Sequence, residues 1–133
     1  MANALYPKFK EALLTGSINM TSNAVKVCLV DLADYTYSAA HQYLSDIPLA
    51  AREEISSALT NKTVTNGGFD SDDPVFTAAT GDPCEALVLF VDTGSPATSR
   101  LIAFYDTGVT GLPVILNGGN INVQVDAQGW FAL

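Results

Sequence analysis

The sequence has few basic residues and few residues of the kinds that build reactive sites. Its 133 residues include six lysines and arginines against 14 aspartates and glutamates, one histidine and two cysteines, and the formal net charge is −8. A protein that binds a phosphate backbone needs a basic face, so we expect no binding to nucleic acid. No apolar run approaches the roughly 20 residues that span a bilayer, so we expect no membrane partner.

The two cysteines, Cys28 and Cys84, are far apart in the sequence, and their spacing fits no metal motif. The N-terminal stretch MANALYPKFKEALL is amphipathic and lacks the apolar core of a signal peptide, which predicts synthesis in the cytoplasm. Structural disulfides are rare in that compartment. We therefore expect two buried, reduced thiols.

Short apolar segments separated by turn residues make up most of the chain. Hydrophobic residues account for 48% of it, and the length suits one domain with a single core. We predict one β-rich domain over residues 1–133, in which residues 1–16 form an N-terminal helical arm with a short helix over residues 5–14. Apolar residues recur there at spacings of three and four, from Leu5 to Leu13. We expect this stripe to pack on the domain, and an exposed arm that docks on a neighbour is the alternative.

About eight short strands are predicted from β-branched content, segment length and flanking turn residues. A run of eight mostly apolar residues, 85–92, predicts a central strand buried on both faces, with residues 100–106 as its hairpin partner. The other strands are expected within residues 24–32, 53–65, 74–79, 112–116, 120–126 and 130–133.

Turn signals complete the fold prediction. Two Asn-Gly-Gly stretches, at residues 66–68 and 117–119, are predicted to be hairpin turns. One or two helical turns are expected over residues 38–44. This pattern favours a mainly β, single-domain antiparallel β-sandwich, jelly-roll-like in strand order, with a short N-terminal helix.

Two apolar segments each end in Asp-Thr-Gly, the tripeptide that carries the catalytic aspartates of aspartic proteases. Such an enzyme needs two carboxylates about 3 Å apart that share a proton. If the strands ending at Asp92 and Asp106 form an antiparallel hairpin, these carboxylates lie roughly 15 to 20 Å apart, and one chain cannot pair them. The favoured interpretation is that Asp and Gly end each strand, with the Asp side chain bonding nearby backbone and the Gly accepting positive φ.

A homodimer that pairs Asp92 with its symmetry mate is the remaining protease hypothesis. The stretch LFVDTGS resembles the active-site loop of the retroviral-type proteases. That family also needs a glycine-rich flap and a later segment that braces the aspartate loop. Neither can be placed convincingly in the rest of the sequence, so this hypothesis is the weaker one.

No other cluster of residues predicts a reactive site. Asp70, Asp72 and Asp73 could hold calcium, but the glycine and closing glutamate of a calcium loop are missing, so an acidic solvated turn is favoured. His41 has no Cys or Asp at ligand spacing, which favours a solvent-facing or capping role. The sequence therefore predicts no enzyme activity, no catalytic residues, no metal and no cofactor.

The order of strand and turn segments along nearly the whole chain carries a resemblance. The opening ANALYPKFKEALLTGSIN, the central GDPCEALVLFVDTGSPATSRLIAFYDTGVTGLPV and the closing NGGNINVQVDAQGWFAL resemble a family of small virion proteins from tailed bacteriophages. This resemblance includes no catalytic motif and transfers no site residue. It implies a capsid cement, or decoration, protein that binds the outer capsid lattice and stabilises the mature head.

The resemblance also implies partners and a location. The partner would be the major capsid protein, on the virion surface, after synthesis in the bacterial host cytoplasm. Lattice sites are symmetric, so we expect a homo-oligomer, a dimer or a trimer. A tail or baseplate component is the alternative within the same structural class.

Contact regions are expected in residues 1–16 and 33–50. Aromatic residues outside the alternating strands are the candidate anchors of the interface, and for each of them packing in the protein's own core is the alternative. These candidates are Tyr6, Phe9, Tyr35, Tyr37, Tyr43 and Phe69.

Overall fold

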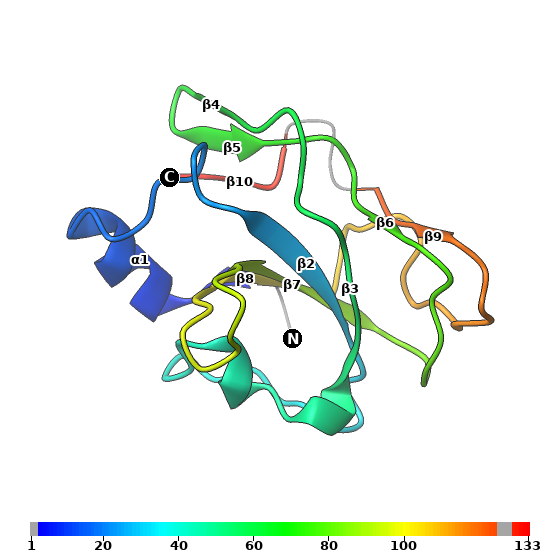
Figure 1. Ribbon diagram of the computed structural model, residues 1–133. Helices are drawn as coiled ribbons and strands as arrows, with labels where there is room; N and C mark the ends of the chain where they lie inside the picture. The colour runs from blue at the N-terminus through cyan, green and yellow to red at the C-terminus, as the bar shows by residue number, and fades with distance from the viewer. Residues whose placement is uncertain (1–2, 125–128) are drawn as a thin grey trace.

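The computed structural model describes residues 3–124 and 129–133 and shows a mainly β fold with antiparallel sheets and a short α-helix near the N-terminus (Figure 1). Within these residues, three sheets are formed, in the strand orders β1-β8-β7-β2-β3, β10-β5-β4 and β6-β9. The elements are β1 (Ala4–Leu5), α1 (Pro7–Leu14), β2 (Val25–Val30), the 3₁₀ helices η1 (Leu44–Asp46) and η2 (Leu49–Ala51), β3 (Arg52–Ile55), β4 (Thr63–Thr65), β5 (Gly68–Asp70), β6 (Val75–Phe76), β7 (Ala86–Val91), β8 (Leu101–Tyr105), β9 (Ile121–Asn122) and β10 (Phe131–Ala132).

Strand β7 occupies the middle of the five-stranded sheet, and all six of its residues are buried. It pairs in antiparallel fashion with β2 on one side and β8 on the other, so that Val88 lies opposite both Cys28 and Phe104. A strand with neighbours on both edges and covers on both faces has no water-facing side, which accounts for its continuous apolar sequence. The predictions of a central strand and of its hairpin partner are confirmed.

Strand β8 connects the central sheet to a different cover on each face. Successive side chains of a strand point to opposite faces, so Phe104 and Tyr105 face opposite ways. The Phe104 ring centroid lies 5.5 Å from that of Tyr37 and 6.4 Å from that of Tyr35. The Tyr105 ring lies 5.6 Å from Trp130, and its hydroxyl donates to the Trp130 carbonyl at 2.7 Å. The segment that holds Tyr35 and Tyr37 covers one face, and the C-terminal strand with its sheet covers the other.

Helix α1 packs on the domain through Phe9 and Ala12, which are both buried. The ring of Phe9 lies edge-on to Phe131 of β10, with centroids 5.7 Å apart. Gly16 ends the helix with φ 78°, and the amides of Gly16 and Ser17 donate to the carbonyls of Leu13 and Ala12. These two hydrogen bonds form the Schellman motif, in which a glycine adopts the left-handed conformation after the end of the helix.

The helix begins two residues later than the sequence predicted. Pro7 occupies the first turn, and the residue before a proline is disfavoured in the α conformation. Tyr6 is accordingly extended, at φ −69° and ψ 128°. The preceding residues form β1, with Ala4 opposite Phe104 and Leu5 opposite Ala103 of β8.

The two Asn-Gly-Gly stretches have different structures. The first closes the β4–β5 hairpin as predicted, with Thr65 opposite Gly68 and positive φ at Asn66 (51°) and Gly67 (78°), as a type I′ turn requires. The second closes no hairpin, because the Gly118 amide donates to the Ala79 carbonyl and the next strand, β9, pairs with β6. The hairpin prediction at residues 117–119 was wrong because the tertiary partner decides the pairing.

Three other sequence predictions differ from the structure. Residues 38–44 form no α-helix; instead η1 begins at Leu44, and the Asp46 carboxylate accepts the backbone N–H groups of Gln42 and Tyr43. Residues 112–116 contribute only an isolated bridge between Val114 and Cys84. The strand expected over residues 120–126 is reduced to β9, and residues 125–126 lie outside the described residues. The jelly-roll strand order stays a prediction.

Truncation of a central side chain tests this description of the core. Leu89→Ala in β7 is expected to lower the free energy of unfolding by about 2–5 kcal/mol, because it leaves a cavity in a fully buried strand. Leu14→Ala is the matched control, since Leu14 is 87% exposed on α1 and its loss is expected to change stability by less than about 0.5 kcal/mol. Urea unfolding of both variants measures the difference, and equal stabilities would contradict the assignment of β7 as the central strand.

Candidate functional site

The two Asp-Thr-Gly stretches lie at opposite ends of the β7–β8 pair. Asp92 follows β7 and Asp106 follows β8, and the antiparallel register places Tyr105 opposite Leu87. Asp106 therefore lies near the start of β7, and Asp92 lies near its end. This geometry keeps the two carboxylates of one chain from sharing a proton.

Both stretches form turns that hold the ends of the strands. The Asp92 Oδ1 atom accepts the Gly94 N–H at 3.0 Å, and Gly94 has φ 89°. At the other end, Gly108 has φ 71°, and the Asp106 N–H donates to the Asn3 side chain at 2.8 Å. The sequence predicted that the aspartate at a strand end bonds nearby backbone and that the following glycine has positive φ. Asp92 and Gly94 show these two features.

Asp92 is also held by a cation from the neighbouring strand. The Lys26 ammonium of β2 lies 2.8 Å from the Asp92 Oδ2 atom. The hydrogen bond from Lys26 and the one from the Gly94 N–H hold the pKa of the Asp92 carboxyl below its usual range, against a smaller opposing effect of burial. Asp92 is therefore ionised at neutral pH, the state that suits an ion pair rather than a proton-sharing dyad.

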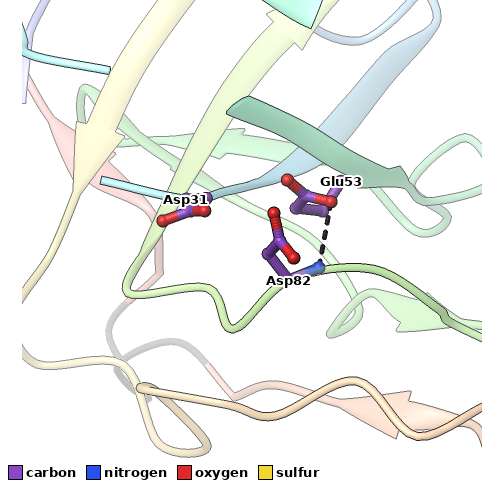
Figure 2. Close-up of side chains that lie close together, drawn as sticks. All are labelled: Asp31, Glu53 and Asp82. Atoms are coloured by element: carbon purple, nitrogen blue, oxygen red, sulfur yellow. Dashed lines mark hydrogen bonds between the residues drawn. The ribbon is translucent and has the colours of Figure 1, made fainter. Parts of the chain in front are cut away.

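Three carboxylates that are far apart in the sequence meet at one end of the central sheet (Figure 2). Asp31 follows β2, Glu53 belongs to β3, and Asp82 lies in the loop before β7. One oxygen of each lies within 4.8 Å of the others, and Figure 2 shows the three side chains turned toward one another. Oxygen donors of this kind are the ligands that Ca²⁺ and Mg²⁺ prefer, so these residues could hold a hard divalent cation.

Local bonds hold two of these carboxylates in place. The Asp31 Oδ1 atom accepts the Ala33 N–H at 2.9 Å, and the Glu53 Oε1 atom accepts the Asp82 N–H at 3.1 Å. Glu53 is the extra residue of a β-bulge, because Arg52 pairs with Val30 and Glu54 pairs with Leu29. Bulges redirect side chains, and this one lets Glu53 reach the loop that carries Asp82. The sequence offered no spacing signal for this cluster, and the expectation that the protein binds no metal stays a prediction.

The acidic stretch that was considered for calcium forms a turn instead. The Asp72 Oδ2 atom accepts hydrogen bonds from the side chains of Thr60 (3.1 Å) and Asn61 (2.6 Å), and Asp70 Oδ1 accepts the Ser71 N–H at 2.8 Å. The two bonds to Asp72 join the stretch to the loop before β4. The favoured interpretation, an acidic turn, agrees with this geometry.

The six aromatic residues proposed as interface anchors lie mostly inside the protein. Tyr6, Phe9, Tyr35 and Phe69 are buried, and Tyr37 and Tyr43 are partly buried. In this conformation the first four cannot contact a partner with their rings. Packing in the protein's own core, the alternative weighed for each residue, describes their position.

His41 is connected to the core by two hydroxyl groups. Its Nδ1 atom lies 2.8 Å from the Tyr35 hydroxyl, which lies 2.8 Å from the Tyr6 hydroxyl. Burial raises the pKa of Tyr35 to about 12 and that of Tyr6 further, so both phenols are neutral at ordinary pH. The chain of bonds pairs polar groups inside the cover formed by the segment around Tyr35. His41 itself is partly exposed, and the expected solvent-facing or capping role stays a prediction.

Both cysteines are free and buried, as predicted. Burial raises the pKa of each thiol to about 12, and the charges of Glu53, Glu85, Asp31 and Asp82 act in the same direction on Cys84. The nucleophilic form of cysteine is the thiolate. Neither residue is therefore suited to covalent catalysis at neutral pH.

An open, largely apolar hollow of about 320 Å³ lies between the end of α1, the β4–β5 hairpin and the C-terminal residue. Two of its lining residues, Val64 and Leu133, are 55% and 67% exposed, and Leu14, which follows the lining residue Leu13, is 87% exposed. We call these three residues and the hollow the apolar end. The hollow is lined by Leu13, Asn19, Met20, Thr21, Val64, Gly67, Gly68, Phe69, Phe131 and Leu133.

No protein-family model matches the chain. No curated protein matches its sequence either. Among residues 3–124 and 129–133, no helix has the length and apolar character to cross a bilayer.

Removal of the Asp92 charge tests its role. Asp92→Asn is expected to fold normally and to lose about 0.5–1 kcal/mol of stability at pH 7, the size of a partly exposed ion pair. The folded pKa is depressed, so this stabilisation is complete above the unfolded pKa of about 3.9 and disappears as the pH falls through the folded pKa. Denaturant unfolding across the acidic range should show the two proteins converging, and a constant difference would contradict the ion-pair assignment.

The carboxylate cluster makes a separate prediction at low ionic strength without added divalent cations. Asp82→Asn removes one of three mutually repelling charges and is expected to raise the free energy of unfolding by up to about 1 kcal/mol, with a smaller gain in high salt. Asp34→Asn is the matched control, because it removes the same charge at an exposed position outside the cluster. A loss of stability in Asp82→Asn alone would contradict the expected repulsion.

Proposed function

We propose that the protein is a non-enzymatic structural component of a phage virion, a cement protein that binds the outer capsid lattice and stabilises the mature head. The resemblance of nearly the whole sequence to small tailed-phage virion proteins supports this proposal. In the structure, the observation that carries it is the apolar end, where exposed aliphatic side chains border a hollow on an otherwise acidic protein. Exposed apolar patches of this kind are typical of protein-binding surfaces.

The mechanism follows from binding to one lattice state. A protein that binds across the joints of the expanded capsid, and not to its precursor, stabilises the expanded form by its binding free energy. Many copies repeat that contribution over the lattice. The molecule must transmit load without deforming, and a sheet with three adjacent buried strands, β2, β7 and β8, supplies close packing that resists deformation.

Contact with the capsid protein would use the apolar end rather than the six aromatic residues. Val64, Leu14 and Leu133 project apolar groups that water now hydrates, and their burial contributes about 25 cal/mol for each Å² covered. Self-association into a dimer or trimer on a lattice symmetry axis belongs to the same proposal. A tail or baseplate component is the second candidate, distinguished by copy number.

The dimeric protease is the weaker alternative because of Lys26. Two aspartates that share one proton need one neutral carboxyl group, and the Lys26 ammonium at 2.8 Å favours the ionised form of Asp92. Pairing two copies at this residue would also bring two lysines close together. The ion pair therefore favours a structural over a catalytic role for this loop.

Copy number in the virion tests the proposal directly. Quantitative mass spectrometry of purified particles is expected to give hundreds of copies in a simple ratio to the major capsid protein. A handful of copies would favour the tail or baseplate candidate, and none would remove the virion assignment altogether. Particles that carry Asp92→Asn should show an unchanged pattern of capsid-protein cleavage.

A matched pair of surface variants tests the contact region. Val64→Lys places a charge on the apolar end, whereas Ile115→Lys places one at an equally apolar residue, 73% exposed, that does not line the hollow. Binding to expanded capsids that lack the protein should fall at least about tenfold for Val64→Lys, the cost of burying one unpaired charge, and should be unchanged for Ile115→Lys. Equal affinities would place the contact elsewhere.

A further inference from the structure

The two Asn-Gly-Gly turns hold their backbone amides differently. At the second turn, the Gly118 N–H donates to the Ala79 carbonyl at 2.7 Å, and the Asn117 Oδ1 atom accepts the Gly119 N–H at 3.0 Å. At the first turn, within the described part of the chain, no side-chain hydrogen bond holds Asn66 and no acceptor meets the Gly67 N–H. Both asparagines are exposed.

This difference matters because an Asn-Gly pair can react with itself. The backbone nitrogen of the glycine loses its proton and attacks the side-chain carbonyl carbon of the asparagine. The new C–N bond closes a succinimide ring, and the side-chain amide leaves as ammonia, which carries away the proton. Water then opens the ring at either carbonyl, which gives aspartate or isoaspartate. No oxidant or cofactor takes part, and glycine is the residue that hinders the attack least.

We propose that Asn66 is a site of spontaneous deamidation in the folded protein and that Asn117 is protected from it. At the second turn, the attacking Gly118 nitrogen must first give up its 2.7 Å hydrogen bond. The side-chain carbonyl of Asn117 must also release the Gly119 amide. Each of these two hydrogen bonds, at ordinary net strength, corresponds to about a fivefold change in rate, so that together they correspond to at least about tenfold. The modification goes beyond the proposed function and does not depend on it.

The product would change the apolar end. Isoaspartate adds one carbon to the main chain inside a two-residue turn whose φ angles are set by the β4–β5 hairpin. The Gly67 carbonyl accepts the Leu133 N–H at 2.8 Å, and a Cβ atom at Gly67 would lie 3.1 Å from the Leu133 carbonyl oxygen. The turn therefore has little room to lengthen without disturbing Leu133 and the hollow that both residues line.

Peptide mapping by mass spectrometry after incubation at mildly alkaline pH tests the proposal. In the folded protein, conversion at Asn66 should run at least about tenfold faster than at Asn117, the factor expected from the two hydrogen bonds that hold the second turn. In denaturant the two rates should be equal, because glycine follows both residues. Equal rates in the folded protein, faster conversion at Asn117, or no conversion at Asn66 would each overturn it.

The variant Asn66→Gly provides the matched control. Gly-Gly also accepts the positive φ angles of a type I′ turn, so the hairpin is retained while the reactive side chain is removed. After equal incubation, hydrogen exchange at the Leu133 amide should be faster in the wild-type protein than in the variant. Identical exchange in a sample converted at Asn66 would overturn the inferred effect on the apolar end.

Discussion

The need to bury β7 on both faces is the constraint on which the rest of the structure depends. With β2 and β8 at its edges and six buried residues, this strand requires a cover on each side of the sheet. Apart from β2, β7 and β8, the strands of the described residues have four residues or fewer. The covers are therefore built from short pieces: the segment around Tyr35 on one face, and α1 with the β10-β5-β4 sheet on the other (Figure 1). Specific side chains hold the polar groups of these irregular covers: the Asp46 carboxylate accepts the N–H groups of Gln42 and Tyr43 ahead of η1, and the Tyr6–Tyr35–His41 chain pairs hydroxyl groups inside the cover.

Strand content was predictable where one residue pattern decided the outcome. The apolar run that became β7 could be buried only at the centre of a sheet, and Asn66-Gly67 favours a type I′ turn whatever surrounds it. Prediction failed where a distant partner decided. Residues 117–119 have the same composition as the first turn. There, however, the Gly118 amide donates to the Ala79 carbonyl, and the strand that follows, β9, pairs with β6.

The carboxylate cluster could not have been found from sequence for a similar reason. Its members are separated by more than twenty residues at each step, and a bulge in β3 decides where Glu53 points. A two-residue periodicity places Glu53 on a face of the sheet, whereas the extra residue in the ladder frees it to reach the Asp82 amide. The aromatic residues proposed as interface anchors show the opposite difficulty. A large aromatic side chain suits an anchor for a partner and equally suits packing inside the protein, where Phe9 and Phe69 each lie against Phe131.

The apolar end and the carboxylate cluster lie beyond opposite ends of β2, and this separation constrains how the molecule could dock. Asn19, Met20 and Thr21, just before the strand, line the hollow, and Asp31 directly follows it. A six-residue strand spans roughly 20 Å, so one partner surface of ordinary size need not cover both. Burial of three adjacent carboxylates against a partner without cations would cost several kcal/mol, whereas burial of Val64, Leu14 and Leu133 is favourable. In the proposed complex the apolar end therefore faces the lattice, and the acidic end of the sheet stays in water, where its charges remain hydrated.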